Sequence, residues 1–164
     1  MELDHFDRRL LNLIQEDAEQ TAERLAEQVP LSVSAIQRRL RRMREEGVIV
    51  RYSAIVDSSK VGRPTIFLVY VQLERERPEL LRQFRNWLGA QANVQQAFYV
   101  TGEADFVLVV TAPDTETYDT LMSRMLADNS NVKRFTTNVA LSVVKTGLTI
   151  PVPTTAAVTR QQDH

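Results

Sequence analysis

The chain has 164 residues, of which 43% are hydrophobic and 25% are charged, and its formal net charge is -1. This composition suits a soluble globular core of one full domain or two small ones, and zero cysteines exclude disulfides and thiolate metal sites. No apolar run approaches about 18 residues and no basic-then-apolar leader opens the chain, so we expect a cytoplasmic protein with neither a membrane span nor a secretory signal.

Three short amphipathic helices with one shared core are predicted at the start of the chain. Apolar residues at helical spacing follow Asp4, a plausible N-cap, and predict a first helix of about a dozen residues. Thr21 can cap a second, shorter helix, and Ser32 can cap a third that ends at Gly47, where the backbone is expected to turn left-handed.

Residues 48–56, VIVRYSAIV, alternate well enough to predict a strand or small hairpin after the third helix. Residues 57–64 are polar and carry Gly62 and Pro64, which is typical of a connection between two domains. We therefore expect a first domain at residues 1–56 and a linker at 57–64.

The second half, residues 65–151, has a different pattern. Its predicted elements, in chain order, are a strand (TIFLVYVQL), a helix (PELLRQFRNWLG), two strands (VQQAFYVT and DFVLVVTA), a helix capped by Asp114 and a long last strand (VKRFTTNVALSVVK). This βαββαβ order predicts an α+β, ferredoxin-like sandwich, with two helices on one face of a four-stranded antiparallel sheet. Residues 152–164 are expected to be a C-terminal tail.

The first strand of that sheet, residues 65–73, has apolar residues at both its even and its odd positions, so both faces of the sheet need a cover. The helices cover one face, and the simplest cover for the other is the same sheet of another copy. We therefore expect at least a dimer through this domain. GLTIPVP, residues 147–153, is expected to continue as an extended segment that lies on the partner.

The third helix carries five arginines in RRLRRMR, residues 38–44. Placed at 100° per residue, it turns its apolar stripe inward, and its outward and flanking residues are Ser34, Gln37, Arg38, Arg41, Arg42 and Arg44. A basic helix after a short helix and a tight turn can enter the major groove, where arginine pairs with guanine and glutamine with adenine. The alternative is a solvated basic face, because arginine is a strong helix former.

The positions of the acidic residues favour DNA over a merely solvated face. Acids such as Glu16, Asp17 and Glu23 lie on or next to the first two helices and are not interleaved with the arginines as i, i+4 partners. We therefore expect a local basic surface that approaches double-stranded DNA. The expected base contacts are Ser34, Gln37, Arg38 and Arg41, and the expected phosphate contacts are Ser32, Arg42, Arg44 and Arg51, the last on the predicted wing.

Two parts of the chain match the pattern of a known family. LDHFDRRLLNLIQED and LAEQVPLSVSAIQRRLRRMREEGVIVRYSAIVD resemble the winged helix-turn-helix of the Lrp/AsnC (feast/famine) transcriptional regulators, and FYVTGEADFVLVV and VKRFTTNVALSVVK resemble their regulatory domain. The resemblance covers roughly residues 2–151. Pro30 and Phe135 depart from the family pattern, which often has a glycine and a small hydroxyl residue there. We expect the ring of Phe135 to change what fits the effector pocket.

The resemblance implies a DNA-binding dimer, often assembled into an octamer of four dimers, whose regulatory domains bind an amino acid or related small molecule between dimers. Carried over residue by residue, the effector-binding candidates are Tyr99, Thr101, Gly102, Glu103, Ala104, Asp105, Thr136 and Thr137. Gly102 permits a backbone that exposes amide N–H groups to a carboxylate, and Asp105 can accept from an α-ammonium group. The alternative for this turn is a plain hairpin connection.

Catalytic and metal-binding signatures are scarce in the sequence. The chain has two histidines, His5 and His164, and no phosphate-binding glycine loop or metal-ligand spacing. Tetrapyrrole decarboxylases of similar fold depend on histidines that this second domain lacks. We therefore expect no enzyme, no metal and no cofactor beyond an amino-acid effector. The predicted function is a sequence-specific DNA-binding transcriptional regulator, and the alternative is a small-molecule-sensing oligomerisation module without DNA binding.

Overall fold

The computed structural model describes residues 2–62 and 64–154, which form two compact units. One unit holds the residues up to Ala54 together with the described residues from Lys145 on. The other unit spans Ile55–Val144. Each unit has its own hydrophobic core, so each is described by itself.

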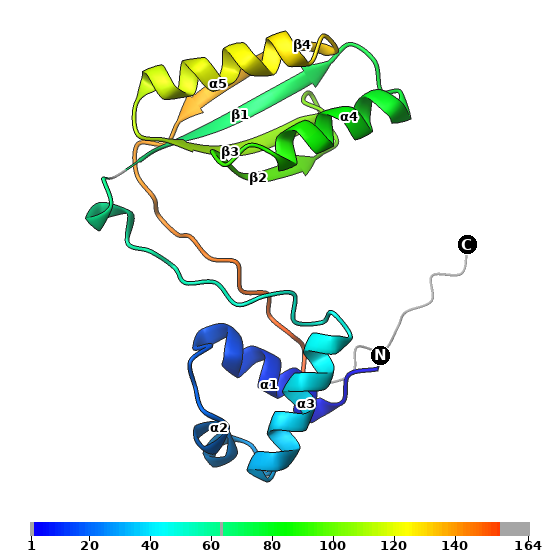
Figure 1. Cartoon of the computed structure of the whole chain (residues 1–164), viewed down its shortest axis with the longest axis vertical. Helices are drawn as coiled ribbons and strands as arrows, with labels where there is room; N and C mark the ends of the chain where they lie inside the picture. The colour runs from blue at the N-terminus through cyan, green and yellow to red at the C-terminus, as the bar shows by residue number, and fades with distance from the viewer. Residues whose placement is uncertain (1, 63, 155–164) are drawn as a thin grey trace. The chain divides into compact units, whose positions relative to one another are not determined.

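Three helices make up the first unit: α1 (His5–Glu16), α2 (Ala22–Gln28) and α3 (Val33–Glu45) (Figure 1). Each begins at its predicted cap, because the side chains of Asp4, Thr21 and Ser32 accept hydrogen bonds from backbone N–H groups of the first turn. Gly47 follows α3 with a φ of 72°, in the left-handed region. The predicted helices, their caps and this left-handed glycine are confirmed.

One hydrophobic core holds the three helices together. Its buried side chains are Leu10, Leu11, Ile14, Leu25, Val29, Ile36 and Met43. They form inward stripes at helical spacing, so the core fixes the rotation of each helix as well as its position. Ile36 and Met43 are fully buried on α3 and leave the opposite face of that helix to solvent.

The predicted strand or hairpin at residues 48–56 is wrong for this structure, because residues 46–57 form no strand. Val50 and Ile55 are 86% and 88% exposed. Alternating apolar residues make a strand only when a neighbour takes up the backbone N–H and C=O groups and a surface covers the apolar side. No strand among the described residues pairs with this segment. Arg51 therefore lies on an irregular connector.

The second unit is the predicted βαββαβ sandwich. Its elements are β1 (Thr65–Leu73), α4 (Pro78–Gly89), β2 (Val94–Tyr99), β3 (Phe106–Ala112), α5 (Thr115–Asp128) and β4 (Val132–Val139) (Figure 1). The strands pair antiparallel in the order β2-β3-β1-β4. The α+β fold class is confirmed.

The two faces of this sheet differ in cover. Phe67, Val69 and Val71 of β1 and their neighbours on β3 are buried in one cluster with side chains of both α4 and α5, so both helices lie on the same face. The opposite face carries Ile66 and Leu68, which stay half-buried with no helix over them. The sheet therefore has one apolar face that no helix of this unit covers. The sequence predicted this face, because β1 has apolar residues at both its even and its odd positions.

The last strand is shorter than predicted. β4 ends at Val139, where it pairs with Phe67 near the start of β1, whereas the sequence predicted a strand through Lys145. A strand needs a neighbour, and β1 begins only two residues before Phe67, at Thr65; the last contact is the N–H of Ala140 donating to the carbonyl of Ile66. Apolar alternation alone did not indicate where the partner strand runs out.

The C-terminal segment joins the first unit. Val152 packs against the core of the three helices, and the backbone groups of Ile150 and Val152 are hydrogen-bonded to side chains of α1. Residues 145–151, placed in the second domain from the sequence, therefore belong to the first unit. The predicted tail, 152–164, is bound where it begins, and its residues 155–164 lie outside the described residues.

Candidate functional site

The outer face of α3 is the candidate DNA-recognition surface. The helix packs on α2 through the turn at Leu31 and buries Ile36 and Met43. Six predicted DNA-contacting side chains of α3 are exposed: Ser34, Gln37, Arg38, Arg41, Arg42 and Arg44. Their predicted outward or flanking positions are confirmed, because the buried stripe fixes the rotation of the helix.

The side chain of Ser32 caps the N-terminal end of α3. Its Oγ accepts the N–H of Ala35 at 3.3 Å and lies 3.2 Å from the Oγ of Ser34. The cap is exposed, so its hydroxyl and the free N–H groups of the first turn stand at the surface. A helix N-terminus with exposed N–H groups suits a phosphate oxygen.

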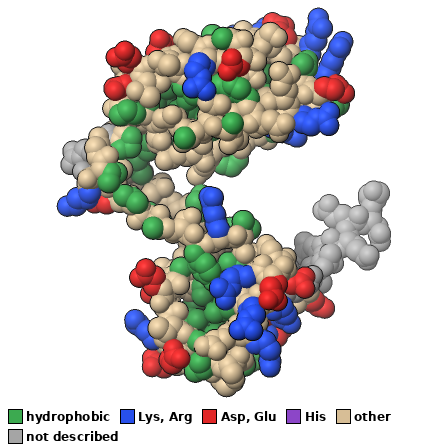
Figure 2. All heavy atoms as spheres, in the orientation of Figure 1, with side chains coloured by type: hydrophobic (Ala, Val, Ile, Leu, Met, Phe, Trp, Pro, Cys, Tyr) green, Lys and Arg blue, Asp and Glu red, His purple; other side chains and the backbone are tan. Residues whose placement is uncertain are grey.

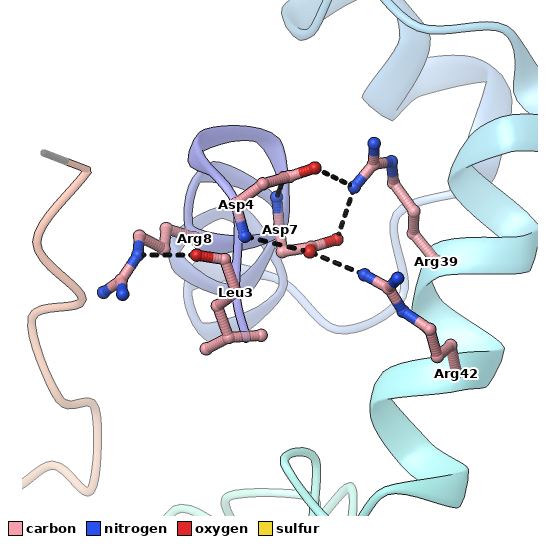
Figure 3. A network of polar contacts seen from close by, with 6 residues as sticks. All are labelled: Leu3, Asp4, Asp7, Arg8, Arg39 and Arg42. Carbon is pink, nitrogen blue, oxygen red and sulfur yellow. Dashed lines mark hydrogen bonds and ion pairs between the residues drawn. The ribbon is translucent and has the colours of Figure 1, made fainter. Parts of the chain in front are cut away.

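A buried carboxylate on α1 holds two arginines of α3 (Figure 3). Asp7 is fully buried, and its two oxygens lie 2.8 Å from Nη1 of Arg39 and 2.7 Å from Nη2 of Arg42. Nη1 of Arg39 also lies 2.6 Å from Oδ2 of Asp4, and the guanidinium stands 5.8 Å from the centre of the Phe6 ring. The network pins the side of α3 that faces α1.

The expectation that no intramolecular acid neutralises the arginines is therefore wrong for Arg39 and Arg42. The acid comes from 32 and 35 residues away in the sequence, so local spacing on α3 does not reveal it. Arg38, Arg41 and Arg44 form no ion pair with any described residue. Figure 2 shows basic and acidic side chains next to one another on the surface of the first unit.

The network shifts the protonation equilibria of its members. The hydrogen bond from Arg39 to Asp7 raises the pKa of the arginine, and the contact with Asp4 adds to this although burial opposes it. Burial favours a higher pKa for Asp4, but the N–H of Asp7 and the guanidinium of Arg39 outweigh it and lower the pKa of that carboxyl. Both shifts keep the pair charged.

The candidate effector turn connects β2 to β3. Gly102 has a φ of 120°, which side chains rarely tolerate, so glycine is required there. The carboxylate of Asp105 accepts the N–H of Leu73 at 2.6 Å, and its own N–H donates to the carbonyl of Val71. Asp105 thus anchors the turn to β1, and its carboxylate is already partly satisfied before any ligand arrives.

A depression of about 510 Å³ lies beside this turn on the face of the sheet without helices. Four of the predicted effector residues line it: Thr101, Glu103, Ala104 and Thr136. The sequence analysis missed its other lining residues, which are Tyr70, Gln72, Val100, Val107 and Arg134. Val100 follows β2, and the other four come from three strands in two adjacent rows, because Tyr70 pairs with Val107 and Thr136, and Gln72 pairs with Arg134.

Arg134 supplies the positive charge of the depression. Its Nε donates to Oε1 of Gln72 at 2.7 Å, and the amide nitrogen of Gln72 donates to the carbonyl of Glu103. This chain of bonds connects β4, β1 and the turn. Gln72, a polar residue after an apolar run in β1, was a signal in the sequence for this part of the site, whereas Arg134 lies among other polar residues of β4 and did not stand out.

Two predicted effector residues lie away from the depression. Thr137 faces the helices, where its hydroxyl is hydrogen-bonded to the Tyr118 hydroxyl of α5. Tyr99 pairs with Phe106 on the helix side, and its hydroxyl donates to Glu76 at 2.5 Å, which raises the pKa of the phenol. Strand alternation sets Thr137 opposite to Thr136, so one pocket on one face of the sheet cannot hold both.

Phe135 also lies on the helix side and is partly buried, so its ring does not line the depression beside the turn, contrary to the expectation that it shapes the effector pocket. It packs against the cluster between the sheet and the helices. A second depression, of about 340 Å³, lies on the helix side beside Tyr99 and Arg85. Among the described residues no group of three or more His, Cys, Asp or Glu could hold a metal ion, and no described helix is long and apolar enough to cross a membrane.

Comparison with known proteins also divides the chain into two parts, with residues 145–150 matched to the second part. Residues 3–50 match the family of winged helix-turn-helix DNA-binding domains, and residues 66–150 match the Lrp/AsnC ligand binding domain. An uncharacterized HTH-type transcriptional regulator of Sinorhizobium fredii is 42% identical over 152 residues, which cover 93% of this chain and 90% of the relative. These matches are to transcriptional regulators and not to enzymes.

Solved structures agree with the fold. The crystal structure of an AsnC family transcriptional regulator from Agrobacterium tumefaciens has a TM-score of 0.83 and 29% identity, and covers 91% of this chain and 97% of its own. The feast or famine regulatory protein from M. tuberculosis, solved in complex with L-methionine, has a TM-score of 0.78 and 26% identity, with 93% and 100% covered.

Replacing Asp7 by asparagine removes the charge that two arginines share. We expect Asp7→Asn to lower the free energy of unfolding by about 3 kcal/mol, the low end for breaking a buried ion pair, because Arg42 stays half-exposed. Urea denaturation followed by circular dichroism measures this. Glu16→Gln, an exposed carboxylate on the same helix, is the matched control and should change little. Equal effects of the two changes would contradict a stabilising pair.

Asp4 should make the stability depend on acid. Its folded-state pKa lies below the ordinary value of 3.8, so its contribution is fully present above that value and is lost as the pH falls through the folded pKa. We expect the urea midpoint to fall as the pH drops below about 4, and Asp4→Asn to remove part of this fall. Identical pH profiles for the two proteins would show that Asp4 contributes nothing.

Proposed function

Because the chain belongs to the Lrp/AsnC family of transcriptional regulators, we propose that it binds specific DNA sequences through α3 and that an amino acid bound by its second unit modulates this binding. The chain has the two parts that such a mechanism needs, a winged helix-turn-helix domain and an Lrp/AsnC ligand binding domain. The observation that carries the proposal is the exposed face of α3, where Arg38 and Arg41 have no acidic partner among the described residues.

Base contacts come from Ser34, Gln37, Arg38 and Arg41. All four are exposed on the side of α3 away from its buried stripe. Arginine can bond both acceptors of guanine, and glutamine can bond adenine through its amide, so these side chains distinguish base pairs in the major groove. Ser34, near the start of α3, has a short side chain, so the backbone of the helix can come close to the bases.

Phosphate contacts come from the ends of this surface. Arg44 lies exposed near the end of α3 and Arg51 lies exposed on the connector that follows. The capped start of α3 at Ser32 offers backbone N–H groups to a phosphate oxygen. One guanidinium nitrogen of Arg42 is bonded to Asp7, and the side chain is half-exposed. Arg42 can therefore contact a phosphate only while it is also paired with Asp7.

A second copy of the chain covers the helix-free face of the sheet in this proposal. That face carries half-buried apolar residues such as Ile66, Leu68 and Val109, which nothing in the second unit covers. Burying it against the same face of another copy removes this apolar area from water and gives a two-fold dimer. Two recognition helices then meet successive major grooves roughly 34 Å apart.

The amino-acid effector occupies the depression next to the β2–β3 turn. Arg134 offers a guanidinium to the α-carboxylate. Thr101 and Thr136 also line the depression, and their hydroxyl oxygens can accept hydrogen bonds from the α-ammonium group. The relative complexed with L-methionine supports an amino acid as the ligand class. The second copy would lie on the same face, so the ligand and the assembly share one surface and each changes the affinity for the other.

Loss of one base-contacting arginine should weaken specific binding. We expect Arg38→Ala to cost about 1 to 3 kcal/mol of affinity for the selected site and to relax its base preference. Selection from random duplexes defines the site, and mobility shift at fixed salt measures the affinity. Arg82→Ala, an exposed arginine of the second unit, removes the same charge as a control and should leave both unchanged. Unaltered binding by Arg38→Ala would overturn the assignment, and no binding by the wild type at low salt would favour a sensor without DNA binding.

Arg134 should decide effector binding. A thermal-shift screen of the twenty amino acids is expected to identify at least one that raises the melting temperature, because a ligand at 100 times its Kd stabilises the folded state by about 2.7 kcal/mol. Arg134→Ala should weaken that ligand by about tenfold or more through the lost charge-assisted bond. Lys133→Ala, the exposed neighbour on β4, is the matched control. A full response from Arg134→Ala would place the effector elsewhere.

A further inference from the structure

One face of α1 is lined by polar side chains that all contact the C-terminal segment. These side chains are His5, Arg8, Asn12 and Gln15, spaced three, four and three residues apart. Such spacing places them in one row along the helix. The row is distinct from the apolar stripe of α1 and from Asp7, which face the core and α3.

Two amide side chains in this row each bind one residue of the segment at both of its backbone groups. Asn12 donates to the carbonyl of Val152 at 2.8 Å and accepts its N–H at 3.0 Å. Gln15 donates to the carbonyl of Ile150 at 3.0 Å and accepts its N–H at 2.7 Å. A neighbouring β-strand would satisfy the same pairs of groups, so the two amides take the place of a strand.

The sequence of the segment matches this pattern. Ile150 and Val152 supply the two N–H groups, and the residues between and after them, Pro151 and Pro153, have none to leave unsatisfied. Prolines also restrict the free segment to extended conformations, which lowers the entropy lost on docking. The row continues past the amides, where Nη1 of Arg8 donates to the carbonyl of Pro153 and the ring of His5 lies 3.0 Å from the carbonyl of Thr154.

Apolar burial adds little to this contact. Val152 packs against the core of the helices, but Ile150 is 71% exposed. Before the segment, Leu141 and Val144 are 99% and 96% exposed, so these two side chains pack on none of the described residues. A segment fixed mainly by solvent-accessible hydrogen bonds opens more easily than the core it lies on.

We propose that this face of α1 is a binding site for extended peptide with prolines at alternate positions, and that residues 150–154 of the same chain fill it as a releasable strap. The strap connects the DNA-binding unit to β4, which carries Arg134 and Thr136, through residues 140–149. Its release lengthens the free connection between the two units without breaking the core of either. The proposal stands on the contacts of α1 and does not depend on which ligand or DNA sequence the protein binds.

Hydrogen exchange of the whole chain tests the strap directly, because among the described residues of the C-terminal segment the side chains of the row accept the backbone N–H groups of Ile150 and Val152. In the wild type both amides should exchange more slowly than in a free peptide. Asn12→Ala with Gln15→Ala should speed both by about tenfold, which corresponds to about 1.4 kcal/mol. Glu16→Ala, next to Gln15 and without a partner among the described residues, should leave them unchanged. Free-peptide rates in the wild type would overturn the proposal.

A peptide added in trans tests the site on α1 apart from the stability of the variants. Ile150→Pro with Val152→Pro in the full-length chain removes both N–H donors and leaves α1 intact, so it should empty the site. A fluorescent peptide of residues 147–154 (GLTIPVPT) should then bind with a saturable rise in anisotropy, and GLTPPPPT should not. Adding Asn12→Ala and Gln15→Ala to that chain should abolish the binding. Equal binding of the two peptides, or none of either, would overturn the site.

Discussion

The buried carboxylate of Asp7 is the constraint on which the recognition surface depends. Its oxygens accept from Arg39 and Arg42, and with Asp4 it forms the reciprocal cap that starts α1. A charge removed from water is tolerated only when such partners surround it, so α1 and α3 must meet in this one register. At 100° per residue, the buried stripe of Ile36 and Met43 leaves Arg38 and Arg41 on the outer side of α3, where Arg38 lies one turn before Arg42. The acid that neutralises Arg39 and Arg42 leaves these two arginines in solvent.

Local signals in the sequence were sufficient for most of the fold. Caps such as Asp4 and Ser32 and the apolar periodicities predict the helices, the sheet and their order, because each depends on neighbours within a few residues. What the sequence did not predict depends on distant partners. Asp7 meets Arg39 across 32 residues, β4 ends where β1 begins, and residues 48–56 form no strand because nothing pairs with them.

The lining of the depression beside the β2–β3 turn was partly predictable for a related reason. The turn at Gly102 was visible as a glycine turn between two strands, and Thr136, one of the effector candidates, lines the depression. Alternation along β4 would also have excluded Thr137, because adjacent residues of a strand face opposite ways. Arg134 needed the register, since only its pairing with Gln72 across the sheet brings that charge beside the turn.

The same short helix, α1, carries three different kinds of contact on three faces. Leu10 packs in the core, Asp7 binds α3 through buried charge, and Asn12 binds the C-terminal segment through exposed hydrogen bonds. Buried packing and a buried ion pair resist opening far more than exposed bonds do, so these contacts differ in how easily they break. Strain arriving along residues 140–149 would therefore detach the segment before it moves α1 against α3. In the proposed function, release of the segment would change the tether of the first unit and leave the outer face of α3 unchanged.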